Sequence, residues 1–137
     1  MRKILEINDL KILAKNKVPK MFYDYVDSGS WTESTYKSNE VDFSKISLRQ
    51  RVGNNIKNIS LKTKIFNKNF DLPFGFSPTG MGGMLYPDGE ALVAQVCAEK
   101  NIPYILSTMT ICSLETITSS AKGSFWFQLY VMKDKNF

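Results

Sequence analysis

The sequence predicts an α/β fold in which right-handed β-α-β units build a parallel sheet. Three short apolar runs predict strands: 72–78 (LPFGFSP), 102–108 (IPYILST) and 124–132 (SFWFQLYVM). The two segments between them have helical patterns, and the connections are short, as in parallel sheets. With 137 residues and 43% hydrophobic content, the chain can bury a core.

The first third of the chain, residues 1–59, is expected to be a helical extension. Helices are expected over residues 7–17, 19–29 and 32–46. Asn8 or Asp9 can cap the first helix. Pro19 suits the first turn of the second helix, which Gly29 can end.

Residues 60–72 predict a β-hairpin. The stretch ISLKTKIF alternates apolar and polar residues, and the extended pattern resumes at FDLP. Between the two stretches, residues 67–69 (NKN) supply the turn. The remaining segment, 73–137, holds the predicted β-α-β units.

The predicted sheet has unpaired edges on both sides. Its last strand, 124–132, is among the most apolar stretches of the chain, and such an edge is a poor place for a domain to end. A closed (β/α)8 barrel needs eight units and about 250 residues. We therefore expect an incomplete (β/α)8 TIM barrel, of which this chain holds the first three strands, and hence an N-terminal fragment of a longer protein.

Small and hydroxyl residues end the predicted strands, in SPTGMGG (77–83) and LSTMT (106–110). Small residues allow a flat ligand to approach the backbone. The glycines fit a tight turn equally well, and the spacing of a dinucleotide or phosphate loop is absent from the sequence.

Strand alternation places Gln128 and Tyr130 on one face of the last predicted strand. One interpretation is a buried amide and phenol that satisfy each other or the backbone. The other is a ligand site at the carboxyl end of a parallel strand. The strand alone does not decide between them.

The net charge of +5 raises the alternative of a small basic module that binds RNA or acidic partners. The lysines are scattered singly, however, and in FWFQLYVMKDK the basic residues follow the aromatic ones instead of interleaving with them. No nucleic-acid partner is therefore expected.

Cys97 and Cys112 lack metal-ligand spacing, so we expect buried thiols in a reducing compartment and no metal site. No apolar run approaches the roughly 18 residues of a membrane span. We expect a cytoplasmic protein, and peripheral association with the inner membrane stays open.

Five motifs occur in order along the chain: YDYVDSGSWTESTYKSN, LRQRV, LPFGFSPTGMGGMLYPDGE, LSTMTICSLE and FWFQLYVMKD. Together they closely resemble the FMN-dependent α-hydroxy acid dehydrogenase/oxidase family, from about Leu10 to Phe137. Two of them, LRQRV and LSTMTICSLE, are most similar to the bacterial L-lactate dehydrogenase branch. The resemblance implies a flavoprotein oxidoreductase with a (β/α)8 barrel and with FMN at its C-terminal face.

The implied reaction is oxidation of an L-2-hydroxy acid to the 2-oxo acid, and the expected substrate is L-lactate. The electrons would pass from FMN to a quinone, a cytochrome or oxygen, and the complete enzyme would be a homo-oligomer.

The resemblance implies five cofactor contacts. The backbone of Pro78, Thr79 and Gly80 would lie beside the flavin ring. Ser107 would be a further contact, and the amide of Gln128 would meet the polar edge of the ring. Gly80 stands where oxidase members of the family often carry alanine. A glycine at this position is similar to the dehydrogenase members.

For the substrate, the resemblance implies that Tyr130 is catalytic: its hydroxyl would contact the substrate and its developing charge. Tyr25, the second tyrosine of YDY, would bind the substrate carboxylate. Met109 falls on the substrate side at a position where members vary, so the identity of the acid is open.

In this family a histidine is the base that takes the substrate's proton, and an arginine and a lysine assist it from later strands. The chain contains no histidine. By itself it is therefore not expected to catalyse, and a non-catalytic flavin-binding fragment is a further alternative.

Overall fold

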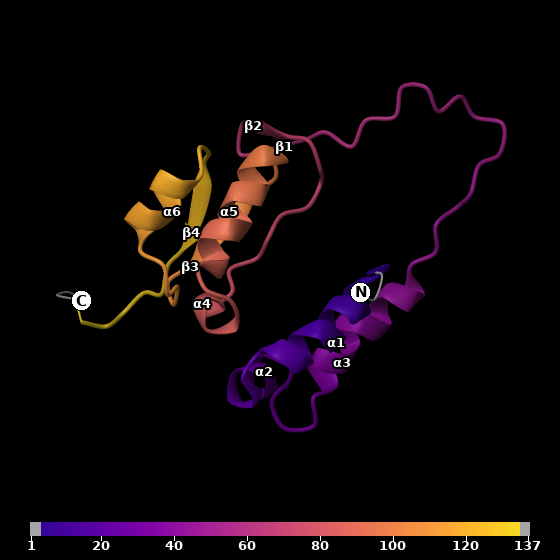
Figure 1. The fold of residues 1–137 in the computed structure, drawn as a ribbon. Coiled ribbons are helices and arrows are strands. Elements are labelled where there is room, and N and C mark those ends of the chain that lie inside the picture. Colours follow the sequence, from indigo (N-terminus) through magenta and orange to yellow (C-terminus); the bar gives the residue numbers. More distant parts are fainter. Residues whose placement is uncertain (1–3, 135–137) are drawn as a thin grey trace. The chain divides into compact units, whose positions relative to one another are not determined.

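The computed structural model describes residues 4–134, which form two compact units with the boundary between Ile59 and Ser60 (Figure 1). Each unit is described by itself. The first contains the helices α1 (Ile7–Lys17), α2 (Lys20–Val26) and α3 (Ser34–Val41), and the short 3₁₀ helix η1 (Asp42–Lys45).

The first helix, α1, spans the predicted residues, but its N-cap is Glu6. Asp9, at the third helical position, reaches back and accepts hydrogen bonds from the backbone N–H groups of Leu5 (2.9 Å) and Glu6 (3.3 Å). The expected capping carboxylate is thus present, but it acts from inside the helix and not from the cap position.

The prediction that Gly29 ends the second helix is wrong, because α2 already ends at Val26. Gly29 serves a different purpose. A Cβ at this position would lie 2.9 Å from the Cβ of Tyr36, so only glycine lets the chain pass this close to α3.

The third helix starts at Ser34, two residues later than predicted. Trp31 and Glu33 have left-handed φ values of 55° and 57°, and the chain therefore enters the helix only after Glu33.

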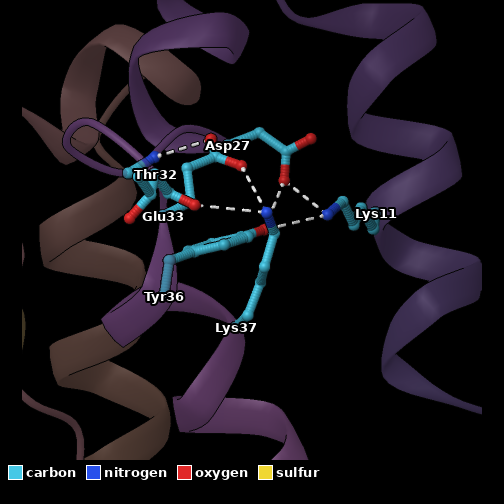
Figure 2. Close-up of polar contacts among 7 residues, drawn as sticks. Lys11, Asp27, Thr32, Glu33, Tyr36 and Lys37 are labelled. Atoms are coloured by element: carbon cyan, nitrogen blue, oxygen red, sulfur yellow. Dashed lines mark hydrogen bonds and ion pairs between the residues drawn. The ribbon is translucent and has the colours of Figure 1, made fainter.

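Figure 2 shows the polar cluster that joins α1 to the end of α2 and to α3. The ammonium of Lys11 lies 2.5 Å from Asp27 Oδ1 and donates to the hydroxyl of Tyr36 (3.2 Å), which donates to Asp27 (3.1 Å). The hydrogen bond from Lys11 lowers the pKa of Asp27. Residues 4–59 contain no buried side chain, so water screens this cluster and it stabilises the unit only weakly.

The second unit contains the parallel sheet. Its elements are β1 (Thr63–Ile65), β2 (Lys68–Phe70), α4 (Gly82–Leu85), α5 (Gly89–Glu99), β3 (Tyr104–Ser107), α6 (Leu114–Ser120) and β4 (Phe125–Gln128). β3 and β4 pair in parallel, with Tyr104 opposite Phe125 and Ser107 opposite Gln128, and α6 connects them. The predicted β-α-β unit is confirmed.

The first of the three predicted strands is reduced to a single parallel bridge between Phe76 and Tyr104. Phe76 uses its N–H toward Pro103 O (3.0 Å) and its C=O toward Ile105 N (3.1 Å). Pro73 and Pro78 have no N–H to donate, which leaves little backbone between them that could extend the ladder.

The last predicted strand, 124–132, is also shorter than expected, because β4 ends at Gln128. Its partner β3 ends at Ser107, so the next residues have no strand to pair with. The prediction that Tyr130 shares a strand face with Gln128 is therefore wrong: Tyr130 lies beyond the strand.

The predicted hairpin forms from β1 and β2, but its two-residue turn is Phe66–Asn67 and not 67–69. Both turn residues have positive φ, 44° and 64°, as a tight hairpin turn requires. The ring of Phe66 packs edge-on against the ring of Trp126, with 5.5 Å between the ring centroids. The ring centroid of Phe70 lies 6.1 Å from that of the same indole. The hairpin thus packs against the side chain of Trp126 on β4.

The helices α5 and α6 lie beside β3 and β4 and enclose the core with them (Figure 1). Leu106 and Ile117 are fully buried, and each such side chain stabilises the fold by about 1.5–3 kcal/mol. Cys97 and Cys112 are buried free thiols, which confirms their prediction as core residues. The N-cap of α6 is Ser113, whose hydroxyl accepts from Thr116 N at 3.1 Å.

Candidate functional site

The three chain segments that follow Phe76, β3 and β4 meet at the carboxyl ends of the strands. The segment after Phe76 is tied to the one after β3 by a backbone hydrogen bond from Met81 N to Met109 O (2.8 Å). A Cβ on Gly80 would lie 3.2 Å from the Cβ of Met109 and 3.9 Å from Ser107 Oγ. Gly80 therefore lies against the end of β3, and the absence of a side chain permits this approach.

Ser107 and Gln128 face each other across the two strands. The hydroxyl of Ser107 lies 3.5 Å from Gln128 Oε1, and Thr108 N lies 3.4 Å from the same oxygen. Because both groups donate, they fix the amide with its oxygen toward β3. Among the hydrogen bonds of residues 4–134 none uses the amide NH₂ of Gln128, which leaves this donor available for a ligand.

Thr108 positions Tyr130. The role of Thr108 was not predicted from the sequence. Its hydroxyl donates to the carbonyl of Gln128 and accepts from the backbone N–H of Tyr130 at 3.1 Å. One side chain thus replaces the strand partner that β4 lacks beyond Gln128. The hydroxyl pair in LST, directly at a predicted strand end, is the signal that could have revealed it. The phenol of Tyr130 is half-exposed.

Of the other predicted site residues, Pro78 and Thr79 immediately precede Gly80, and Thr79 is exposed. The structure brings Gly80, Ser107 and Gln128 together, with Pro78 and Thr79 in the same loop as Gly80. Tyr25 belongs to the first unit, where it is 66% exposed on α2.

A buried carboxylate behind this loop was also missed. Glu90 is only 4% exposed, although it occupies the first turn of α5. Helical spacing puts it on the face of Ala94 and Cys97, and this charge on an apolar face is the signal that could have identified it. Its Oε1 accepts from Gly83 N (3.0 Å) and Ile111 N (3.1 Å).

Burial by itself would raise the pKa of Glu90, but the hydrogen bonds from backbone N–H groups, above all that of Ile111, favour the ionised form and lower it overall. The thiol of Cys112 donates to Glu90 Oε2 at 3.4 Å. Burial and this carboxylate raise the pKa of the Cys112 thiol, so it is neutral near pH 7.

The donor set fits a flat, polar, aromatic ring such as that of FMN. Gly80 exposes backbone without a side chain, and Gln128 presents an amide NH₂ suited to ring carbonyl oxygens, while the hydroxyl of Ser107 donates to the oxygen of the same amide. The described residues 4–134 hold no cluster of three metal-ligating side chains.

A candidate ligand site at the carboxyl ends of parallel strands, with β-α-β connections behind it, is typical of α/β proteins that bind cofactors. The sequence model of the family described as FMN-dependent dehydrogenase matches residues 14–137. The chain belongs to this family, which confirms the resemblance read from the five motifs.

Named relatives agree with this assignment. The chain is 42% identical to the L-lactate dehydrogenase of Pseudomonas syringae pv. syringae over 134 residues, which is 98% of the chain and 35% of the relative. It is 41% identical to that of Acinetobacter baylyi over 130 residues, 95% of the chain and 34% of the relative. The chain therefore spans about a third of the length of the curated relatives that it matches.

Solved structures match the fold. A soluble mutant of the membrane-associated (S)-mandelate dehydrogenase from Pseudomonas putida matches with a TM-score of 0.89 and 31% identity, over 95% of this chain and 37% of that one. A mandelate oxidase matches with a TM-score of 0.90 and 26% identity, over 98% and 39%.

Proposed function

We propose that this chain is the first part of an FMN-dependent dehydrogenase that oxidises an L-2-hydroxy acid, L-lactate, to the 2-oxo acid. The observation that carries the proposal is the meeting of Gly80, Ser107 and Gln128 at the carboxyl ends of β3 and β4. The names of the relatives support lactate. Mandelate, the substrate named for the matched structures, is the competing acid.

In this proposal the backbone of Pro78, Thr79 and Gly80 and the side chains of Ser107 and Gln128 would hold the flavin. Gln128 would donate its free NH₂ to the cofactor, and Ser107 would also keep the amide in that orientation. FMN would supply an acceptor for the two electrons that leave the substrate carbon, and a quinone, a cytochrome or oxygen would be their next acceptor.

Tyr130 and Tyr25 serve the substrate. Tyr130 donates its phenol proton in a hydrogen bond to the substrate oxygen, and Tyr25 binds the carboxylate. The base that removes the hydroxyl proton is a histidine in the family; this chain has none, so the proposal places the base elsewhere in the complete enzyme.

We assign residues 1–59 to a helical extension, 60–72 to the hairpin and 73–137 to the first β-α units of a (β/α)8 barrel. The matched solved structures, of which the chain covers 37% and 39%, support a larger whole. We propose a homo-oligomer without a nucleic-acid partner, located in the cytoplasm or peripherally at the inner membrane. No helix within residues 4–134 is long and apolar enough to cross a membrane.

A hybrid protein tests the proposal. Residues 1–137 replace the matching third of the Pseudomonas syringae L-lactate dehydrogenase, and the purified hybrid is analysed for bound FMN and for bleaching of the flavin by L-lactate or (S)-mandelate under anaerobic conditions. We expect bound flavin that L-lactate reduces.

The matched pair of variants in this hybrid is Gln128→Leu, which should lose flavin, and Gln50→Leu, an exposed amide of the first unit, which should keep it. A folded hybrid without flavin, or with a flavin that neither acid reduces, would contradict the proposal.

A further inference from the structure

The side chain of Glu90 hydrogen-bonds two loops at once. Its Oε1 accepts from Gly83 N, at the start of α4, and from Ile111 N, after β3, at 3.0 and 3.1 Å. Its Oε2 accepts from the thiol of Cys112 at 3.4 Å. A carboxylate that is 4% exposed and satisfied by three donors from two loops fixes the separation of those loops.

The neighbouring glycines are shaped around this carboxylate. A Cβ on Gly82 would lie 3.1 Å from Glu90 Cδ, and a Cβ on Gly83 would lie 2.9 Å from the Cβ of Ile111. The contact at Gly83 is too close for a side chain, and the contact at Gly82 would require Glu90 to shift by a few tenths of an ångström. The two glycines therefore let the loop settle onto Glu90 and onto the segment after β3, which gives the GMGG sequence a packing role.

The same loop carries the cofactor contacts. Gly80 precedes Gly83 by three residues, and Met109 precedes Ile111 by two. On the side of Gly80, a backbone hydrogen bond from Met81 N to Met109 O joins the loops. Glu90 supplies the second connection, so together they prevent the loops from rotating about that bond.

We propose that Glu90 is a positioning residue whose buried carboxylate clamps loop 77–83 to loop 108–112 and so sets the surface on which the flat cofactor rests. The inference deepens the proposed function and depends on it for the identity of the cofactor. The clamp itself consists only of residues of this chain, so it can be tested without the cofactor.

The two free cysteines allow a test of the clamp without flavin. Cys112 donates to the carboxylate and lies 9% exposed, whereas Cys97 lies in the core at 1%. Labelling of the native 137-residue chain with a thiol reagent, quantified for each cysteine by mass spectrometry, reports local opening at Cys112 and global unfolding at Cys97.

Both Glu90→Ala and Glu90→Gln remove the charge that raises the pKa of the Cys112 thiol, so the two variants are compared with each other. We expect Cys112 to react about tenfold faster or more in Glu90→Ala than in Glu90→Gln, because only the amide oxygen of glutamine can still accept both N–H bonds, while Cys97 reacts at the same rate in both. Glu99→Ala removes an exposed carboxylate from the same helix and should change neither rate.

A second measurement in the hybrid connects the clamp to the cofactor. Glu90→Ala should weaken FMN binding by about tenfold, and Glu90→Gln should restore it. If Cys112 and Cys97 accelerate together, or if Cys112 does not change, Glu90 is a general stabiliser or a bystander and the clamp is wrong. If no version of the hybrid holds FMN, the proposed function fails, and the thiol rates still decide the clamp.

Discussion

Gly75 marks the closest approach of two backbones at the start of the sheet. A Cβ there would lie 2.7 Å from the carbonyl oxygen of Pro103 and 2.8 Å from its Cβ. Because backbone cannot move aside like a flexible side chain, Gly75→Ala should lower the free energy of unfolding by about 1–3 kcal/mol.

Gly123→Ala is the matched control, since its Cβ would meet Ala98 Cβ at an ordinary 3.4 Å. Urea unfolding of both variants measures the difference. Equal stabilities would show that the Phe76 bridge relaxes easily.

Glu90 should make stability depend on pH. Its folded pKa is lowered below the unfolded value of about 4.3, so its contribution is fully present above that pH and is lost as the pH falls through the folded pKa. The thermal midpoint of the unsubstituted chain should therefore drop more steeply below about pH 4 than that of Glu90→Gln.

The nearby titratable groups do not blur this comparison. Burial raises the pKa of the Cys112 thiol and that of Tyr104, the latter to about 12, so both stay neutral in acid. Asp88 is common to both proteins. Parallel acid profiles would show that the carboxylate is not preferentially ionised in the fold.

At the scale of elements, the hydroxyl of Thr108 holds the segment that follows β4 in place. Thr108→Val keeps the shape of the side chain but removes the bonds to the Gln128 carbonyl and to Tyr130 N. Each neutral bond contributes about 0.5–1.5 kcal/mol, so we expect a loss of about 1–3 kcal/mol and faster amide exchange at Tyr130.

The control is Thr118→Val, whose hydroxyl bonds only the preceding turn of α6. Exchange at Tyr130 that stays slow in Thr108→Val would mean that other contacts hold the segment.

Helical segments could be predicted from local signals, although the end of α2 and the start of α3 were misplaced. The apolar period of α5 lies within the helix itself, and the Ser113 cap directly precedes α6. The length of β4 depends instead on where its distant partner β3 ends, and the bridge at Phe76 depends on which backbone N–H groups the prolines leave. Apolar content alone contains neither piece of information.

The hairpin turn was misplaced for a related reason. The residues NKN resemble a turn more than Phe66 does, yet Phe66 takes the left-handed position because its ring contacts Trp126, sixty residues further along the chain. A tertiary contact overrides the local preference there.

For the site, the sequence motifs predicted Gly80, Ser107 and Gln128, which the structure brings together. Thr108 and Glu90 were missed, because their importance lies in backbone groups that they satisfy, and the partners of such bonds appear only in three dimensions.

At the scale of the whole molecule, the proposed role of Tyr130 is testable in the hybrid enzyme. Tyr130→Phe keeps the ring and removes the hydroxyl, so flavin content and thermal midpoint should hardly change. The lost hydrogen bond should cost about 1–3 kcal/mol in the transition state and lower the rate of flavin reduction roughly 10- to 100-fold.

Stopped-flow reduction by L-lactate measures this rate. Tyr86→Phe removes another exposed phenol of the second unit and serves as the control. A Tyr130→Phe rate equal to that of the parent would remove Tyr130 from the site.

The register of β3 and β4 also bears on how the chain assembles during synthesis. Ser107 and its partner Gln128 are 21 residues apart, so the loop that must close is short for a parallel pair. At about 5–20 residues per second, the ribosome adds the pairing strand within about one to four seconds. Early pairing would bury Leu106 and Ile117 while translation continues, and it would shorten the time in which the edge of β3 can join a strand of another nascent chain.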